Sequence, residues 1–438
     1  FKTLVFLLNA RAMRRSFLHP FISALADIPY FPFLTDFLRM KKRRIVITGA
    51  GVISSLGFTK ESLYQSLLDG RSAVRFMPEW QGQIPVGSDT VTAAPVELPP
   101  EMSKSIKRHY RRSMGNAALF ATLAAQAAVT ESGLTPAELS GGRTGCIISS
   151  TIGSSSEVYE STKAVIEKRF NELSACQFFR IVSHSSAFNV ANFFGINGVQ
   201  LSPCSACASS LQSIGLAYEQ ILAGRQEVFL AGGSDEVTPI VVSSFRHLYA
   251  LAESGELEPQ AQSRPFDARR CGLVCGEGAG ILVVEEYEHA LRRHAPILAE
   301  ISGYATNCSG SQISQSDSAS IETCMRLALA DAQLSPEEVD YVSAHATSTV
   351  AGDREEAAAI RAIFADRVPV SSSKGYLGHT LGASGAIESA AVLEMIRHEV
   401  ILPNGNLEQV AGDCAGLNLP VPVVYAGSDR NIPYGTAI

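Results

Sequence analysis

The sequence lacks a basic excess, a long apolar run and a regular cysteine framework. Its 438 residues carry a formal net charge of −7, which argues against nucleic acid as the main partner because a phosphate-binding protein needs clustered positive charge. No stretch has the roughly 18–20 consecutive apolar residues of a transmembrane helix. The nine cysteines are an odd number spread over a long chain, so we expect a reducing, cytoplasmic environment rather than a disulfide framework.

The first 40 residues differ in pattern from the rest. The run "FKTLVFLLNA" is shorter than the apolar core of a signal peptide, and Pro20, Pro29 and Pro32 interrupt the residues after it. "MKKRRIVITGAG", which starts at Met40, is typical of a natural N-terminus. We interpret residues 1–40 as a leader of doubtful status and expect the fold to begin at residue 41.

From residue 44 the chain alternates short β-branched runs with longer amphipathic stretches. Buried strands are predicted at residues 44–49, 143–149, 227–233 and 280–286, and two of the predicted helices end at Gly133 and Gly224. A second series of strands and helices begins near residue 297. The sequence therefore predicts an α/β protein with two similar halves, residues 41–290 and 291–438.

The stretch "SPCSACASS" (202–210) places two cysteines three residues apart. A strand is predicted before it and a helix from Ser209, so Cys207 falls at a strand-to-helix turn. The partial positive charge of a helix N-terminus lowers the pKa of a nearby thiol, which indicates a nucleophile. We interpret Cys204 as its small buried neighbour, and other cysteines as core or near-core packing, namely Cys146, Cys308 and Cys324.

A redox or zinc site is the alternative for these cysteines. Cys204 and Cys207 could form a redox pair, or could bind zinc together with Cys271 and Cys275. The second pair has three residues between its cysteines, where zinc sites usually have two. This alternative is the weaker one.

Two histidines follow predicted strands in the second half. His345 ends a strand at 339–345, and Asp353 and Glu356 lie in the helix that follows. Lys374 and His379 lie five residues apart in "SSSKGYLGHTLGASGA". Because reacting groups in open α/β sheets collect where strands end, these turns and the cysteine turn together favour catalysis over a structural role for the histidines.

Two glycine-rich stretches imitate nucleotide-binding loops. "GAGVISSLG", after the first strand, has Ser54 in place of the third glycine, so we interpret it as a plain strand-to-helix turn. "GEGAG" (276–280) precedes a strand, which predicts close backbone approach rather than phosphate binding.

The basic run "KSIKRHYRR" (104–112) leaves two interpretations open, a solvated helix start and a docking patch for an acidic partner.

The motifs together resemble those of one family. "SACASS" around Cys207, "HATST" at His345 and "KGYLGHTLGASG" at Lys374 and His379 resemble the three motifs of the decarboxylating (elongating) β-ketoacyl-acyl carrier protein synthases, and "SRPFDARRCGLVCGEGAGILVVEE" (263–286) matches as well. The resemblance covers about residue 42 to the end. It implies the thiolase fold, with two βαβ-rich halves in a five-layered α/β/α/β/α core, as a homodimer or a heterodimer with a related ketosynthase.

The resemblance also implies an activity. Cys207 takes an acyl chain from acyl carrier protein as a thioester, and malonyl-acyl carrier protein then loses carbon dioxide. His345 and His379, as neutral imidazoles, donate hydrogen bonds to the malonyl thioester oxygen, while Lys374 pairs with Glu356 and holds the histidine loop. The product is a 3-oxoacyl-acyl carrier protein in fatty-acid or related polyketide or polyene elongation. No metal or organic cofactor is required apart from the phosphopantetheine on the carrier.

The sequence departs from the family pattern at three places. Ala346 stands where "HGTST" has glycine, and we expect it to be tolerated if its φ is negative. "NCSGSQISQSD" (307–317) lacks a histidine and a proline that the family often shows. The chain given stops at "NIPYGTAI", before the last strand and glycine-rich loop that supplies the second oxyanion N–H in the family, so we expect this chain to condense poorly. A non-catalytic subunit that shapes a partner's acyl pocket is the alternative function, although the presence of Cys207 argues against it.

Overall fold

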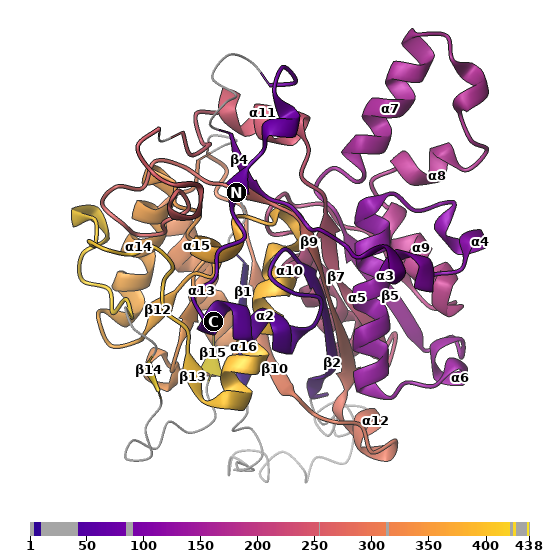
Figure 1. The fold of residues 1–438 in the computed structure, drawn as a ribbon. Coiled ribbons are helices and arrows are strands. Elements are labelled where there is room, and N and C mark those ends of the chain that lie inside the picture. The colour runs from indigo at the N-terminus through magenta and orange to yellow at the C-terminus, as the bar shows by residue number, and fades with distance from the viewer. Residues whose placement is uncertain are drawn as a thin grey trace, which may run out of the picture.

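Helices pack against both faces of a central sheet, and further helices and short strands of the second half lie beside it (Figure 1). The computed structural model describes residues 4–9, 43–84, 91–253, 255–311, 315–420, 424–425 and 436–437. Most of the sequence motif "NIPYGTAI" and part of "NCSGSQISQSD" lie outside the described residues.

The central sheet has the strand order β15-β1-β10-β2-β9-β7-β5-β6. Its strands are β1 (Leu4–Asn9), β2 (Ile45–Ser54), β5 (Thr144–Ser149), β6 (Gln200–Leu201), β7 (Val228–Asp235), β9 (Gly278–Glu286), β10 (Ala299–Thr306) and β15 (Thr436–Ala437). β6, β5 and β7 run parallel, whereas β9, β2 and β10 pair antiparallel with their neighbours. A parallel pair, β11 (Val342–Ser343) and β12 (Val370–Ser371), completes the second half.

Helices cover both faces of the sheet and separate the two halves. α5 (Asn116–Ser132) and α9 (Ser185–Phe194) pack on one face, and α10 (Ser209–Leu222) and α16 (Ser384–His398) pack on the other. α13 (Ser318–Ala332) covers β10, and α14 (Val350–Phe364) packs on α13. The buried apolar side chains fall into clusters between these layers, which matches the five-layered α/β/α/β/α core expected from the sequence.

Shorter elements connect the layers. They are α2 (Lys60–Leu68), β3 (Arg75–Phe76), β4 (Thr92–Ala94), α3 (Pro100–Ser105), α4 (Arg108–Arg111), α6 (Pro136–Leu139), α7 (Ser155–Ile166), α8 (Gln177–Ile181), α11 (Pro239–His247), β8 (Cys275–Gly276), α12 (Tyr287–Arg292), α15 (Lys374–Leu377), β13 (Val400–Ile401) and β14 (Val424–Tyr425). No helix among the described residues is long and apolar enough to span a bilayer.

The strand β1 is not predicted by the sequence pattern, which sets residues 1–40 apart as a leader. Leu4–Asn9 pairs antiparallel with β10. β10 would otherwise present an unpaired edge on that side, and Leu4–Asn9 covers this edge. The described part of this segment therefore belongs to the central sheet.

The prediction of a turn in "GAGVISSLG" is wrong for residues 49–54 and right only for Ser55 and Leu56, which form a turn before α2. β2 continues through these residues to Ser54 and pairs antiparallel with β9, which also rules out the parallel βαβ unit of a dinucleotide fold. The glycines serve packing, because a Cβ on Gly51 would lie 1.9 Å from the carbonyl oxygen of Ala124 on α5. The close approach expected for "GEGAG" is confirmed, since a Cβ on Gly280 would lie 2.5 Å from the Ala386 backbone.

We expect Gly51→Ala to lower the free energy of unfolding by about 2–3 kcal/mol, because the added methyl group forces α5 away from β2. Urea unfolding followed by circular dichroism measures the change. Gly412→Ala is the matched control. Gly412 is exposed, and a Cβ added there would have no heavy atom within 4 Å, so its change should stay within about 0.5 kcal/mol. Equal stability of Gly51→Ala and the wild type would contradict the packing argument.

Candidate active site

Cys207 lies at the turn between β6 and α10, as predicted. The preceding residue, Ala206, has a left-handed backbone with φ 50°, a conformation that is uncommon for residues other than glycine and is characteristic of sharp functional turns. The Sγ atom of Cys207 lies 2.8 Å from Nε2 of His379. Both side chains border a cavity of about 540 Å³. The thiol is therefore accessible and already has a hydrogen-bonding partner.

The other cysteines only partly match their predicted roles. Cys146 and Cys324 are buried, as expected, but Cys204 and Cys308 are exposed. Cys204 lies in the loop after β6, where its Sγ is 3.5 Å from the carbonyl oxygen of Thr151, so the prediction of a buried neighbour is wrong.

The zinc alternative for the four cysteines fails, and Cys204 and Cys207 form no disulfide in the structure. All of them are free thiols. Among the described residues, Cys204, Cys207, Cys271 and Cys275 do not gather into a group of metal ligands.

The two histidines come together beside the thiol. His345 follows β11 and His379 follows α15, and their ring centroids lie 5.2 Å apart with the ring planes at 86°. Burial, together with the positive charge of Lys374, holds the pKa of both imidazoles well below the usual value for histidine. Both rings are thus neutral at pH 7, the state needed to donate a hydrogen bond without carrying charge.

A serine orients the ring of His379. Nδ1 of His379 lies 2.9 Å from Oγ of Ser384 at the start of α16. A hydroxyl that donates to Nδ1 leaves the proton on Nε2, and a hydroxyl that accepts leaves Nε2 free to take a proton. His379 can therefore accept a proton from Cys207 in one step and donate a hydrogen bond in another.

The thiol pKa does not follow the sequence expectation. Burial raises the pKa of Cys207 to about 11, and the nearby Lys374 ammonium only partly opposes this. The helix N-terminus was expected to lower the thiol pKa, but the rise caused by the loss of hydration of Cys207 is larger. Activation of this thiol requires proton transfer to a base as it attacks, and His379 is the base in contact.

Lys374 pairs with a different acid from the one predicted. Its ammonium donates a hydrogen bond to Oε1 of Glu388 on α16. Glu356 instead accepts hydrogen bonds from the backbone N–H groups of His345 and Ala346, at 2.7 and 2.6 Å. The prediction of a Lys374–Glu356 pair is wrong, although Glu356 does hold the histidine loop.

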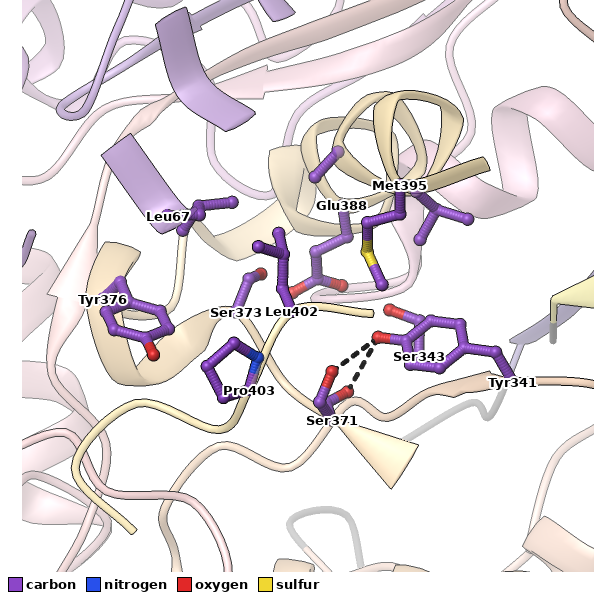
Figure 2. Close-up of a pocket in the computed structure, with 12 residues that line it drawn as sticks. Leu67, Tyr341, Ser343, Ser371, Ser373, Tyr376, Glu388, Met395, Leu402 and Pro403 are labelled. Carbon is purple, nitrogen blue, oxygen red and sulfur yellow. Dashed lines mark hydrogen bonds between the residues drawn. The ribbon is translucent and has the colours of Figure 1, made fainter. Parts of the chain in front are cut away.

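Glu388 is a member of the site that the sequence did not predict. It lies four residues after Ser384 on α16, so the two share a face of that helix. Figure 2 shows its side chain extending from the helix toward a cavity of about 10 Å³, which Ser343 and Ser373 also line. The sequence did contain a signal for this residue, because Glu388 is acidic within the mostly apolar stretch of α16.

Two smaller expectations concern the same loops. Ala346 is buried and is not among the residues with positive φ, so its substitution for glycine is accommodated as predicted. His379 follows the short helix α15, which Lys374 begins, rather than ending a strand as predicted. This helix carries the chain from β12 to His379.

Asp235, at the end of β7, connects the cysteine turn to the His379 turn. Its carboxylate accepts hydrogen bonds from Oγ of Ser150, from the N–H of Thr151 at 3.0 Å and from the N–H of Gly382 at 2.7 Å. The hydroxyl of Thr151 in turn lies 3.5 Å from the carbonyl oxygen of Ala206. One buried carboxylate thus contacts the His379 loop directly and the Cys207 turn through Thr151.

We expect Asp235→Asn to lower kcat about tenfold or more with little change in KM, because its amide N–H₂ would face a backbone N–H and loosen one of the two turns. Steady-state kinetics measures both constants. Asp366→Asn, at an exposed position, is the control and should leave both unchanged. A rise in KM alone would contradict a positioning role for Asp235.

A thiol at a helix start, two neutral histidines beside it and a five-layered fold of two similar halves define a condensing enzyme of the thiolase fold. The family model "Beta-ketoacyl synthase, N-terminal domain" matches residues 42–290, and "Beta-ketoacyl synthase, C-terminal domain" matches residues 298–408. The chain belongs to the β-ketoacyl synthase family. It is an acyltransferase that condenses an acyl group with a malonyl group.

Curated relatives and solved structures agree with this assignment. The 3-oxoacyl-acyl-carrier-protein synthase 1 of Haemophilus influenzae is 36% identical over 379 residues, covering 86% of this chain and 91% of the relative. A crystal structure of a β-ketoacyl synthase from Burkholderia phymatum has a TM-score of 0.82 at 37% identity, covering 87% of this chain and 93% of that one. The ishigamide ketosynthase/chain length factor has a TM-score of 0.80 at 32% identity, covering 88% and 94%.

Proposed function

We propose that this chain is an elongating 3-oxoacyl-acyl carrier protein synthase whose catalytic residues are Cys207, His345 and His379. The observation that carries the proposal is the contact of 2.8 Å between Cys207 Sγ and His379 Nε2 at the wall of an open cavity. We assign the nucleophile to a half comprising residues 41–290 and both histidines to a half comprising residues 291–438. The family's relatives are named for acyl carrier protein, which supports it as the donor of both substrates.

The first step is transfer of the acyl chain to sulfur. As Cys207 Sγ attacks the acyl carbonyl carbon, its proton passes to Nε2 of His379, and the carrier's phosphopantetheine sulfur leaves and takes up that proton. The backbone N–H of Cys207 is one donor for the oxyanion formed on the acyl group. The high pKa of the free thiol makes this coupled proton transfer necessary, since the thiolate is scarce at neutral pH.

The second step forms the carbon–carbon bond. The C–C bond to the malonyl carboxylate breaks, carbon dioxide leaves, and the electron pair remains as an enolate on the malonyl thioester. His345 and His379 donate hydrogen bonds to the enolate oxygen. The enolate carbon attacks the Cys207 thioester, the carbon–sulfur bond breaks and a 3-oxoacyl-carrier is released. The Cys207 thiolate takes up one proton from solvent.

Lys374 and the acids act on this chemistry through charge and position. The Lys374 ammonium disfavours protonation of both histidines, which keeps them as neutral donors. Glu388 balances its charge within the protein. Glu356 fixes the His345 backbone through two hydrogen bonds.

Intact-mass analysis tests the proposal. After incubation with an acyl-carrier, we expect a single acyl adduct on the peptide that contains Cys207. After addition of malonyl-carrier we expect its conversion to 3-oxoacyl-carrier, at the low rate expected of this chain from its sequence. An adduct on another cysteine would refute the assignment of the nucleophile. No adduct at all, together with tight association with a second ketosynthase, would favour the chain-length-shaping subunit, the function for which the ishigamide complex provides a precedent.

The basic run at residues 104–112 is proposed as the docking patch for acyl carrier protein. Lys104, Lys107, Arg108 and Arg112 are exposed on and beside α3 and α4, and an acidic partner gains rate and orientation from such a patch. We expect Arg108→Glu to raise the KM for acyl-carrier about fivefold, which corresponds to about 1 kcal/mol, with kcat unchanged. The control is Arg225→Glu, an equal charge reversal at another exposed position. An equal rise in KM for that variant would show that the net charge of the protein, and not the basic run, determines the affinity for acyl-carrier.

A second ketosynthase chain is the proposed protein partner. α7 and α8 project from the body of the molecule (Figure 1), and this region exposes large apolar side chains, namely Val158, Tyr159, Val165, Ile166, Phe170, Phe178 and Phe179. Monomers rarely expose so many apolar side chains in one region. We infer a homodimer, with a heterodimer as the alternative.

We also infer a cytoplasmic location, supported by cysteines that are all unpaired.

A further inference from the structure

The three proposed catalytic side chains also form a set of metal ligands. Cys207, His345 and His379 each offer one ligand atom, and these atoms all lie within 4.8 Å of one another. Thiolate and imidazole are the ligands that zinc prefers. Three protein ligands with one open position are the arrangement of catalytic zinc sites, in which water or a small ligand occupies the fourth place.

The surrounding structure fixes these ligands as metal sites require. His379 is held through Nδ1 by Ser384 at 2.9 Å, so its Nε2 faces the thiol. A hydrogen bond at the second ring nitrogen is the usual support of a metal-binding histidine. The loop of His345 is fixed by Glu356. The cavity of about 540 Å³ borders all three side chains, which provides access and an open fourth position.

The local charge is compatible with a cation. Within the described part of the chain, the ammonium of Lys374 lies near the site and opposes cation binding. It is paired with Glu388. Two further carboxylates lie close by, because Glu356 contacts the His345 backbone and the charge of Asp235 acts on the Cys207 thiol. Three acids therefore surround one buried base.

We propose that the unacylated site binds a zinc ion through Cys207 Sγ and the imidazoles of His345 and His379, and that the bound ion blocks acyl transfer. The thiol proton is released to solvent when the sulfur binds the ion. An acylated sulfur has lost its negative charge, so acylation and zinc binding exclude each other. The inference rests on the proposed function only in naming acyl transfer as the step that the ion inhibits. The metal site itself does not depend on catalytic activity.

Cobalt(II) binding to the whole, chelator-treated chain tests the site without an activity assay. A thiolate bound to cobalt gives a charge-transfer absorption in the near ultraviolet. We expect this band to saturate at one cobalt per chain and to disappear when zinc is added. Cys207→Ala should abolish the band, and His345→Ala and His379→Ala should each weaken cobalt binding about tenfold or more.

Two controls keep the result interpretable. Glu61, Glu394 and His398 form a second candidate group without sulfur, so His398→Ala should leave the thiolate band unchanged. Alkylation of Cys207 in the wild-type protein, mapped by mass spectrometry, should remove the band even if a variant fails to fold. A missing band in the wild type, or a band that survives loss of Cys207, would overturn the proposal. A cobalt band without an acyl adduct would support the metal site and refute the proposed function. An acyl adduct without a cobalt band would refute the metal site and support the proposed function.

Discussion

Replacement of Cys207 by alanine is expected to abolish the acyl adduct and to reduce condensation to the rate without enzyme. The acyl chain then has no sulfur to bind, and the enolate has no thioester to attack. His345 and His379 remain in place, so release of carbon dioxide from malonyl-carrier should continue. Intact mass, product chromatography and carbon dioxide release measure the three outcomes separately.

Cys204→Ser is the matched control for this prediction. Cys204 lies three residues earlier and is exposed, and its sulfur is directed to the carbonyl of Thr151 rather than to a histidine. We expect this variant to form the adduct and to condense like the wild type. Condensation by Cys207→Ala, or its loss in Cys204→Ser, would show that the nucleophile has been misassigned.

Replacement of His345 by alanine is expected to lower the rate of decarboxylation and condensation by about two to three decades. The variant loses one of two donors to the enolate oxygen, and the loss of one such donor typically costs about 3–4 kcal/mol of barrier. The acyl adduct on Cys207 should still form, because His379 and not His345 contacts the thiol. Single-turnover assays of acylation and of decarboxylation separate the two effects.

His184→Ala serves as the control for the histidine variant, since His184 is exposed at the start of α9. It should leave both steps unchanged. If His345→Ala lost acylation and decarboxylation to the same extent, His345 would act in both steps, and the division of roles between the two histidines would be wrong.

The sequence predicted the candidate site residues where a reactive residue type stands directly after a strand or a turn. Cys207 and His345 follow short strands, and His379 follows a glycine-rich turn. Their positions in the chain were enough to select them. The strands and helices around them were equally readable, because apolar periodicity records which face is buried.

The errors concern properties that depend on packing across the fold. The pKa of Cys207 was expected to fall, but the depth of its burial is set by loops distant in sequence. Glu388 was missed as the partner of Lys374, because that contact depends on how α16 lies against α15. The glycines of "GAGVISSLG" are typical of a turn, whereas α5 packs on them from more than 70 residues away.

The two halves are joined by shared packing as well as by chain connectivity. β10 of the second half pairs with β2 of the first, α16 packs on β9, and α10 touches β10 and β1. Because the sulfur belongs to one half and the imidazoles to the other, an opening that separates the two halves breaks the 2.8 Å contact. The reactive centre therefore assembles only when both halves are folded, and partly folded forms of this chain lack the pairing of Cys207 with His379.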